Sequence, residues 1–289
     1  MTSQANDILL PLPRKGVSHA VVFFEKMPES VMTAFLDNLR AEYPNLQPLN
    51  PQRWGAASEP RPISFGELLS DDPDGGWQRV TRWHLLLDSE GVAPEVKAAI
   101  AESPQTPDER VQQKMEEAGA SILVFLLADG SDVSTPVSKM KALCRPVWQL
   151  LKMGGTGVAF PEGGTMLGAE TLKMLPVDEL SAGHSYLFIS SGLAEKAHGK
   201  MWFRTYGMAQ FGLPDLCHGV PEGLEGEELE DELLRTRLVM ETLPPEMIAQ
   251  GGVLPIGGEV MVGPRVFRAA RPPEKGPETA SRFGLCFLE

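Results

Sequence analysis

Cysteine, basic side chains and long apolar runs are all scarce in this chain of 289 residues. Its cysteines, Cys144, Cys217 and Cys286, are too few and too far apart for a disulfide framework, which is typical of a reducing compartment. No apolar run approaches the roughly 20 residues that a membrane-spanning helix needs. The first residues also lack the basic start and apolar core of a secretory signal. The sequence therefore predicts a cytoplasmic protein that makes no contact with a membrane.

The shortage of basic charge bears on the kind of partner. Lysine and arginine number 26 against 39 aspartates and glutamates, which gives a formal net charge of -13. Nucleic-acid binding needs a local surplus of basic side chains, and none is present, so no nucleic acid is expected. An acidic surface can attract a basic protein partner, or it can simply keep the chain soluble. Charge alone favours the second interpretation.

Familiar catalytic and cofactor motifs are absent as well. The segment "GGTGVAF" has Phe160 where a dinucleotide fingerprint needs its third glycine, and it leads from a helix into a strand, the reverse of the required order. Gly199-Lys200 lacks the earlier glycine of a phosphate-binding loop. The pattern also includes no nucleophile elbow around Ser190 and Ser191, no C-x-x-C and no H-E-x-x-H. We expect no cofactor and no metal, and we assign no catalytic residue.

What is present is an alternation of apolar strands with amphipathic helices. This pattern predicts an α+β fold, a layered sheet-and-helix domain that ends in short antiparallel strands after Gly251. A duplicated ferredoxin-like unit is one arrangement that would fit. We expect strands within 18–26, 77–88, 120–130, 156–160, 184–193 and 201–206, and helices within 29–43, 65–69, 135–154, 165–175 and 221–243, with two short helices within 92–119.

Domain organisation follows from where this alternation restarts. Strand-helix units occur near the start of the chain and again after residue 120. The sequence predicts an N-terminal α/β lobe at residues 1–118 and a C-terminal α+β lobe at residues 119–289.

The densest group of aromatic and polar residues is Trp202 to Leu216, "WFRTYGMAQFGLPDL". Strand alternation places Trp202, Arg204 and Tyr206 on one face. Arg204 could form a stacked ion pair with Asp215 or the acidic helix, or it could line a pocket for an anion. We favour a buried structural arginine, which is the commoner outcome.

Two polar groups nearby leave alternatives open. Asp215, Cys217, His218 and Glu222, with His198, could converge on a metal or supply a Cys–His nucleophile pair, but neighbours on an extended backbone point to opposite sides, and solvated side chains are the default. The acidic run from Glu222 to Glu232 leads into two arginines and predicts a helix that matches its own dipole. We interpret that helix as a solvated face, with a partner-docking surface as the alternative.

One stretch resembles a known family. "RTYGMAQFGLPDL", preceded by "ASILVFLLADG" and "SKMKALCRPVWQLLKMGGTGVAF" and followed by "GGVLPIGGEVMVG", is similar to the bacterial family catalogued as domain of unknown function 4261. The resemblance covers about residues 17–289, and its specific part is residues 204–216. Cys217-His218 and the lack of an aspartate in "IGGEV" depart from the family pattern. The resemblance implies a cytoplasmic accessory or binding protein, and it supplies no catalytic residues.

Two functional hypotheses follow. The first is a non-enzymatic protein-interaction module of adaptor or immunity type, with a protein partner and with Arg204, Tyr206, Asp215 and His218 as candidate binding residues. The second is a hydrolase or transferase whose pocket is built around Arg204, Tyr206, Asp215 and a histidine, either His198 or His218. A structural protein without a dedicated ligand is a third. The sequence does not determine the oligomeric state.

Overall fold

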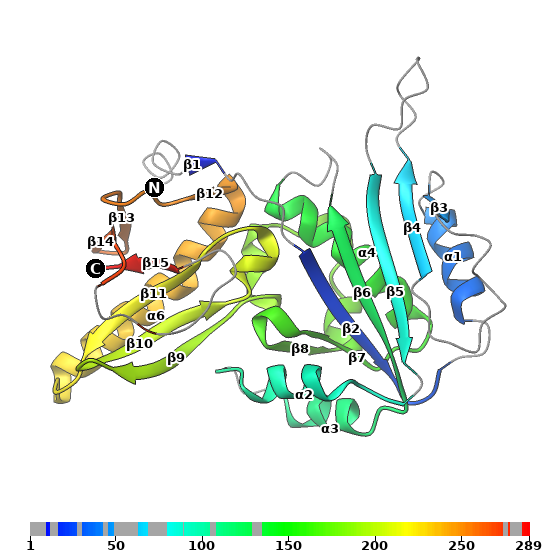
Figure 1. Cartoon of the computed structure of the whole chain (residues 1–289), viewed down its shortest axis with the longest axis horizontal. Coiled ribbons are helices and arrows are strands. Elements are labelled where there is room, and N and C mark those ends of the chain that lie inside the picture. The colour runs from blue at the N-terminus through cyan, green and yellow to red at the C-terminus, as the bar shows by residue number, and fades with distance from the viewer. Residues whose placement is uncertain are drawn as a thin grey trace, which may run out of the picture.

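The protein folds into two main β-sheets with helices packed on them (Figure 1). The computed structural model describes residues 10–11, 17–27, 31–42, 46–48, 63–68, 80–88, 90–104, 108–128, 135–273, 277 and 285–289. Within these residues, one sheet has seven strands in the order β3-β4-β5-β6-β2-β7-β8, and the other has six in the order β13-β14-β15-β11-β10-β9. This arrangement confirms the predicted α+β fold, whereas the ferredoxin-like duplication stays a prediction.

The seven-stranded sheet is antiparallel throughout. Its strands are β2 (Val17–Phe24), β3 (Leu46–Pro48), β4 (Ile63–Leu68), β5 (Val80–Asp88), β6 (Ala120–Ala128), β7 (Gly157–Phe160) and β8 (Thr165–Gly168). The interior strand β2 is buried on both faces, which is why its sequence contains a continuous apolar run.

Helices cover both faces of this sheet. Alternate residues of β2 pack into two different core clusters. Val22 and Phe24 belong to the large cluster that includes residues of α1 (Val31–Glu42) and α4 (Pro136–Lys152). Val21 and Phe23 belong to a smaller cluster with residues of α2 (Pro94–Ala101) and α3 (Glu109–Glu116).

The predicted start of α4 is confirmed in detail. The Thr135 side chain accepts a hydrogen bond from the Ser138 backbone N–H, and the Ser138 side chain accepts one from the Thr135 backbone in return. Pro136 stands in the first turn, where its missing N–H costs nothing. Gly154 follows the helix with a φ of 108°, a conformation that glycine adopts without strain.

The six-stranded sheet is built by the C-terminal part of the chain. Its strands are β9 (Ser190–Ala197), β10 (Lys200–Tyr206), β11 (Asp215–Pro221), β13 (Glu259–Val262), β14 (Arg265–Ala270) and β15 (Leu285–Leu288). Among the described strands of this sheet, β11 and β15 alone pair in parallel. The long helix α6 (Gly226–Gln250) packs against this sheet through Val239, Leu243 and Met247, all of them buried.

Short elements complete the described chain. They are the helix α5 (Ala169–Lys173), the 3-10 turns Pro161–Gly163, Val177–Glu179, Ala182–Leu187 and Met208–Phe211, and the small strand pair of β1 (Leu10–Pro11) and β12 (Gly252–Val253). Across the part of the chain that the structure describes, no helix is long and apolar enough to cross a membrane.

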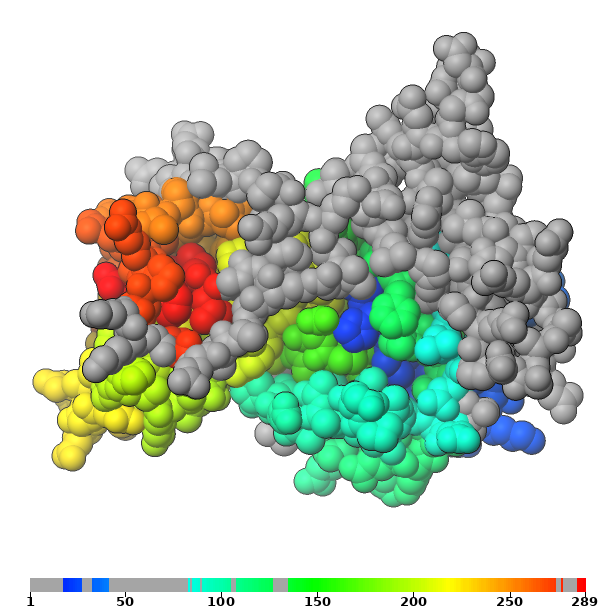
Figure 2. Space-filling view, viewed as in Figure 1, coloured from blue at the N-terminus to red at the C-terminus, as the bar shows by residue number. Residues whose placement is uncertain are grey.

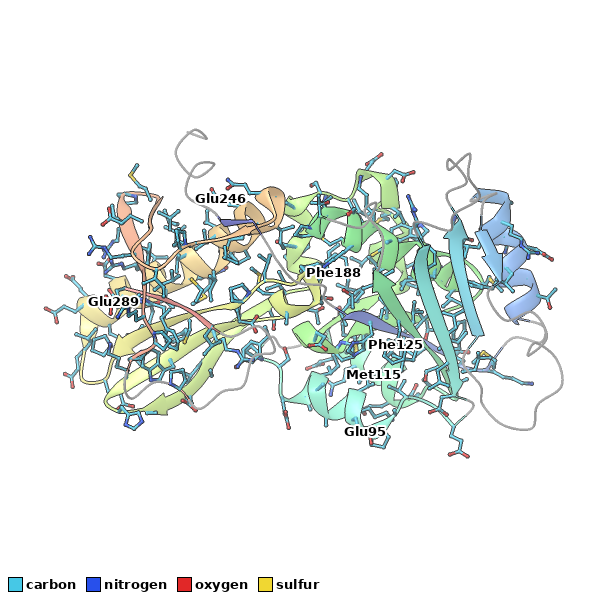
Figure 3. The ribbon with its side chains drawn as sticks, turned by 45° about the horizontal axis from the view of Figure 1, so that its top comes forward. Glu95, Met115, Phe125, Phe188, Glu246 and Glu289 are labelled. Atoms are coloured by element: carbon cyan, nitrogen blue, oxygen red, sulfur yellow. The ribbon has the colours of Figure 1, made fainter. Side chains whose placement is uncertain are left out.

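One hydrophobic core joins the two sheets. Phe188 lies in the middle of the molecule (Figure 3), and its ring centroid is 4.7 Å from that of Phe160 and 5.9 Å from that of Phe211. The predicted boundary between residues 118 and 119 falls immediately before β6, which pairs with β5 on one side and β2 on the other. The seven-stranded sheet therefore takes strands from both sides of that boundary.

Two predicted helices are wrong in whole or in part. Residues 63–68 form β4 because they pair with β3 and β5, and this pairing overrides local preference; residue 69 lies outside the described residues. Within 165–175, the first four residues form β8 and only Ala169–Lys173 is helical. Gly164, at a φ of 61°, reverses the chain so that β8 runs back along β7.

The strand predicted within 184–193 begins later than expected and continues to Ala197. The chain forms a 3-10 turn from Ala182 to Leu187, and β9 begins only at Ser190. This turn packs against α6, and it leaves Tyr186 at the surface with 63% of its area exposed.

Candidate functional site

The strand β10 carries the residues that the sequence singled out, and it lies between β9 and β11. The register sets Arg204 opposite Cys217 of β11 and Gly192 of β9. Because side chains alternate along a strand, Trp202, Arg204 and Cys217 lie on one face of the sheet, and Phe203 and its partner His218 lie on the other. The predicted alternation of β10 is thus confirmed.

Arg204, Tyr206 and Asp215 come together, which is one of the alternatives that the sequence left open. The Arg204 guanidinium lies over the Tyr206 ring, 4.4 Å from its centroid, and its Nη2 is 3.9 Å from the Asp215 carboxylate. The Arg204 Nε donates a hydrogen bond of 3.3 Å to the Thr205 carbonyl. Only 9% of Arg204 and 3% of Asp215 is exposed. The group is a buried ion pair covered by an aromatic ring.

Asp215 also holds the turn that follows β10. Its Oδ1 accepts hydrogen bonds from the Met208 N–H at 3.2 Å and from the Thr205 hydroxyl at 3.4 Å. Gly207 begins this turn at a φ of 101°, and a Cβ there would lie 2.5 Å from the Phe188 carbonyl oxygen. The contacts of Asp215 therefore explain the pattern "RTYGMAQFGLPDL" as the fastening of one turn to the next strand.

His218 is not part of this group. Its Nε2 lies 3.1 Å from the Glu232 carboxylate on α6, and its Nδ1 lies 3.0 Å from the carbonyl oxygen of Leu288 on β15. Both partner atoms are acceptors, so the two hydrogen bonds form together when both ring nitrogens carry a proton. His218 thus ties β11 to α6 and to the last strand, on the face of the sheet opposite Arg204.

The cysteines are placed as core residues. Cys217 packs with Trp202 and Phe287, and all three cysteines are buried and unpaired. Burial raises the pKa of Cys217 to about 12, although the Arg204 charge acts in the other direction. A thiol with so high a pKa is a poor nucleophile near neutral pH. Cys217 and His218 also point to opposite faces, so they do not form a Cys–His pair.

The remaining candidates for a metal site are spread out. His198 and Glu222 are both exposed, and His198 lies in the two-residue turn between β9 and β10 with a φ of 56°. Among the residues that the structure describes, no three histidine, cysteine, aspartate or glutamate side chains gather in a way that could hold a metal ion.

A different surface stands out on α6. Leu234 is 64% exposed and Leu238 is 37% exposed, one helical turn apart. Glu227, Glu230 and Asp231 precede them on the same side of the helix. We call this set the α6 stripe. The yellow end of the molecule, where α6 begins, protrudes at one side of Figure 2.

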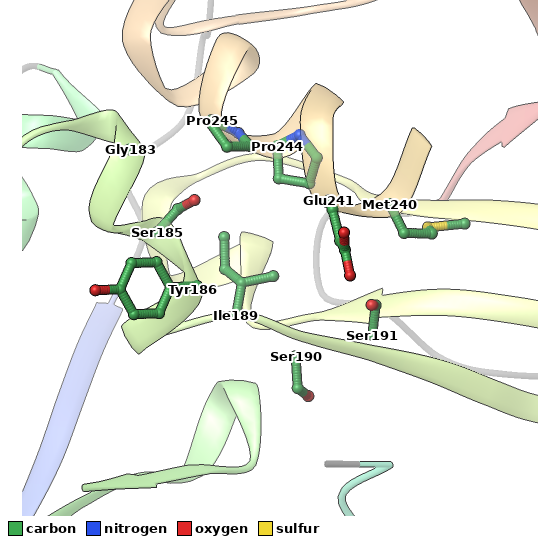
Figure 4. A pocket seen from close by; sticks show the side chains of 10 residues that line it. All are labelled: Gly183, Ser185, Tyr186, Ile189, Ser190, Ser191, Met240, Glu241, Pro244 and Pro245. Carbon is green, nitrogen blue, oxygen red and sulfur yellow. The ribbon is translucent and has the colours of Figure 1, made fainter. Parts of the chain in front are cut away.

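A small pocket of about 140 Å³ lies beside the same helix. It is formed between α6 and the segment that leads into β9 (Figure 4). Its lining residues are Gly183, Ser185, Tyr186, Ile189, Ser190, Ser191, Met240, Glu241, Pro244 and Pro245. The pocket combines apolar walls with hydroxyl groups and one carboxylate.

The pocket and the exposed leucines were not predicted from the sequence. Leu229, Leu233 and Met240 also lie at helical spacing in this segment, and nothing in the pattern separates Leu234 and Leu238 from them. The available signal was the Pro244-Pro245 pair inside a helical pattern, which marks a place where the helix lacks backbone donors.

Comparison with known proteins adds no relative. No protein-family model matches the chain, and no curated protein and no solved structure matches it. The resemblance to domain of unknown function 4261 stays a prediction.

Proposed function

We propose that this chain is a cytoplasmic, non-enzymatic interaction module that binds a basic protein through the α6 stripe. The observation that carries the proposal is the exposure of Leu234 and Leu238, 64% and 37%, next to a cluster of acidic side chains. Exposed apolar anchors surrounded by charge are typical of the centre and rim of a protein interface.

The charge around the leucines specifies the partner's chemistry. Glu227, Glu228 and Glu230 are exposed and make no ion pair with any other described residue. Asp231 is paired with Arg265 of β14. Glu232 is paired with His218 and Arg235, where α6 packs against the sheet. The unpaired acids attract a basic surface, which raises the rate of encounter and favours a basic partner over an acidic one.

The helix also has the rigidity that an interface needs. Val239, Leu243 and Met247 bury its opposite side against the sheet, and the Asp231–Arg265 pair holds its first turns to β14. A helix fixed in this way presents its exposed side chains with little loss of entropy on binding.

The enzymatic alternative has less support from the described residues. It needs Arg204, Tyr206, Asp215 and a histidine in one pocket. Arg204 and Asp215 are buried, His218 contacts Glu232 on the opposite face, and His198 lies in an exposed turn. The Arg204 group fits a structural role, and the α6 stripe fits a binding role.

The test is affinity capture from an extract of the native host, followed by mass spectrometry. The wild-type chain should retain one basic protein in near-equal amount, and retention should fall as salt rises because exposed charges are screened. Leu234→Ser and Leu238→Ser should each lower retention about tenfold or more, as expected for residues at the centre of an interface.

Met174→Ser is the matched control, because Met174 is an exposed apolar residue at the end of α5 and belongs neither to the stripe nor to the pocket. It should retain the partner like the wild-type chain. The proposal fails if the stripe variants and the control retain the same protein equally, or if no basic protein is retained in near-equal amount.

A further inference from the structure

We propose that the pocket between α6 and the segment Gly183–Ser191 binds a lysine side chain of the protein partner. This inference rests on the proposed function and identifies the contact that would give it specificity. It follows from the position of the pocket, from its acceptors and from its walls.

The pocket continues the α6 stripe. Leu234, Leu238, Glu241 and Pro245 are separated by four, three and four residues, so they lie on one side of the helix. Glu241 and Pro245 line the pocket. Seven residues of helix from Leu234 to Glu241 span about 10 Å. A partner segment that covers the leucines is therefore within reach of the pocket.

Two backbone acceptors belong to residues of the pocket. Pro244 and Pro245 have no N–H, so the regular helical bonds from these positions to the carbonyls of Met240 and Glu241 cannot form. Met240 and Glu241 both line the pocket. A lysine ammonium has three donors and no acceptor, which suits a site rich in acceptors.

Side chains add charge and hydroxyl groups to the same place. Ser191 and Glu241 point toward one another across the pocket, whereas Ser190 points away from it (Figure 4). The Ser190 hydroxyl instead donates to the Gly163 carbonyl. The Glu241 carboxylate supplies a negative charge, and a hydrogen bond between an ammonium and a carboxylate is stronger than one between neutral groups.

The walls suit the methylene stem of lysine. Ile189 points toward Pro244, and the two proline rings close one side of the pocket (Figure 4). Tyr186 also lines the pocket, and its exposed ring points away from Glu241 and the prolines (Figure 4). Lysine places an apolar stem against such walls and keeps its charged end at the polar atoms.

Arg237 competes with a ligand cation for the Glu241 carboxylate. Its Nε is 2.7 Å from Glu241 Oε1, and both side chains are largely exposed. A carboxylate has two oxygens and accepts several hydrogen bonds, so a second cation can share it. Exposed ion pairs of this kind are weak, so a ligand ammonium can replace Arg237 at the carboxylate.

The probe is Nα-acetyl-L-lysine amide, and its binding is measured by NMR from the shifts of the backbone amides of the full chain. A dissociation constant on the order of 1 mM is expected for so small a ligand. Shifts should appear at residues 183–191, 240–243 and 246. The same compound with its ε-amine acetylated has the stem but no charge, and it should cause no shift there.

Three variants sharpen the test. Glu241→Gln should weaken lysine binding at least tenfold. Arg237→Gln removes the competing cation and should strengthen binding about two- to fivefold, the equivalent of a surface ion pair. Glu225→Gln is the matched control, with the same loss of charge on the exposed residue that precedes α6, outside the stripe and the pocket, and it should bind like the wild-type chain.

The inference is overturned if the charged and acetylated ligands shift the same amides equally, if only other residues shift, or if nothing shifts. A partner that is lost from Leu234→Ser but held as well by Glu241→Gln as by the wild-type chain would also overturn it, while the proposed function would stand. If lysine binding depends on Glu241 but no basic partner is captured, the pocket would still be a lysine site, and the proposed function would be wrong.

Discussion

Arg204 shows how a residue that looks catalytic in sequence can be structural. Its charge is balanced by Asp215 and its plane is covered by Tyr206, with little of it exposed. Removing one member of a buried pair leaves the other charge without a partner in a place that water does not reach. Arg204 therefore contributes to the stability of the folded chain.

We expect Arg204→Ala to lower the free energy of unfolding by about 3 kcal/mol, the typical cost of breaking a buried ion pair. Urea unfolding followed by circular dichroism measures it. The control is Arg237→Ala, an arginine whose pair with Glu241 is exposed, and it should change stability far less than Arg204→Ala does. An Arg204→Ala protein as stable as the wild type would contradict the structural role.

The buried thiols make a second prediction at the residue scale. Burial raises the pKa of Cys217 and of Cys286 to about 12, whereas an unfolded cysteine titrates near 8.5. Between these values the folded chain keeps protons that the unfolded chain loses. The stabilising contribution of each thiol is therefore complete below about pH 8.5 and is lost as the pH rises toward 12.

We expect the free energy of unfolding to fall between about pH 9 and 11, and Cys217→Ala should reduce the slope by up to about 1.4 kcal/mol per pH unit. Denaturant unfolding at several pH values measures this slope. Leu216→Ala, at the neighbouring buried position of β11, removes apolar volume but no titrating group and should leave the slope unchanged. Equal slopes in wild type and Cys217→Ala would show that folding does not raise the pKa of the Cys217 thiol.

At the scale of elements, the hairpin of β9 and β10 depends on two residues. His198 and Gly199 form its turn with φ values of 56° and 75°. Two positive φ values in a two-residue turn match the right-handed twist of the strands. Glycine adopts this conformation freely, but histidine does so at some cost. This requirement accounts for His198 at the turn without any catalytic role.

We expect His198→Asn to keep or slightly raise stability, and His198→Val to lower it by about 1–2 kcal/mol, because a branched side chain disfavours positive φ. Thermal unfolding measures both. Lys196→Val, on the exposed side of β9 in the same hairpin, should change stability by no more than about 0.5 kcal/mol. A neutral His198→Val would mean that the turn adopts another conformation in solution.

At the scale of the whole molecule, the two sheets share one core. Phe188 contacts both Phe160 of β7 and Phe211 of the turn after β10. Neither sheet can lose this contact without exposing apolar surface of the other. The chain should therefore unfold as one unit, in spite of its two sheets.

We expect Phe188→Ala to lower the free energy of unfolding by about 3–5 kcal/mol, as for other fully buried phenylalanines. In each of the two proteins, tryptophan fluorescence and circular dichroism should give one common midpoint, since Trp83 and Trp148 report on the first sheet and Trp202 on the second. A Tyr186→Ala variant, which truncates an exposed ring of the same segment, is the control and should stay close to wild type. Two separate transitions would instead support two independent lobes.

The sequence by itself determined the elements whose signals are local. We could predict the apolar runs of β2 and β6, the cap at Thr135 and the alternation of β10. Their signals depend only on residues that are close together in the sequence. The pairing of Arg204 with Asp215 was also among the stated alternatives, since the two lie only one turn apart in the chain.

Tertiary structure alone decided the rest. Residues 63–68 are a strand because β3 and β5 are their neighbours. His218 meets Glu232, 14 residues on, because α6 folds back over β11. Leu234 is exposed and Leu243 buried on the same helix because the sheet covers only one of its sides. Hydrogen-bond partners and burial of this kind depend on residues distant in sequence, and they exist only when the chain has folded.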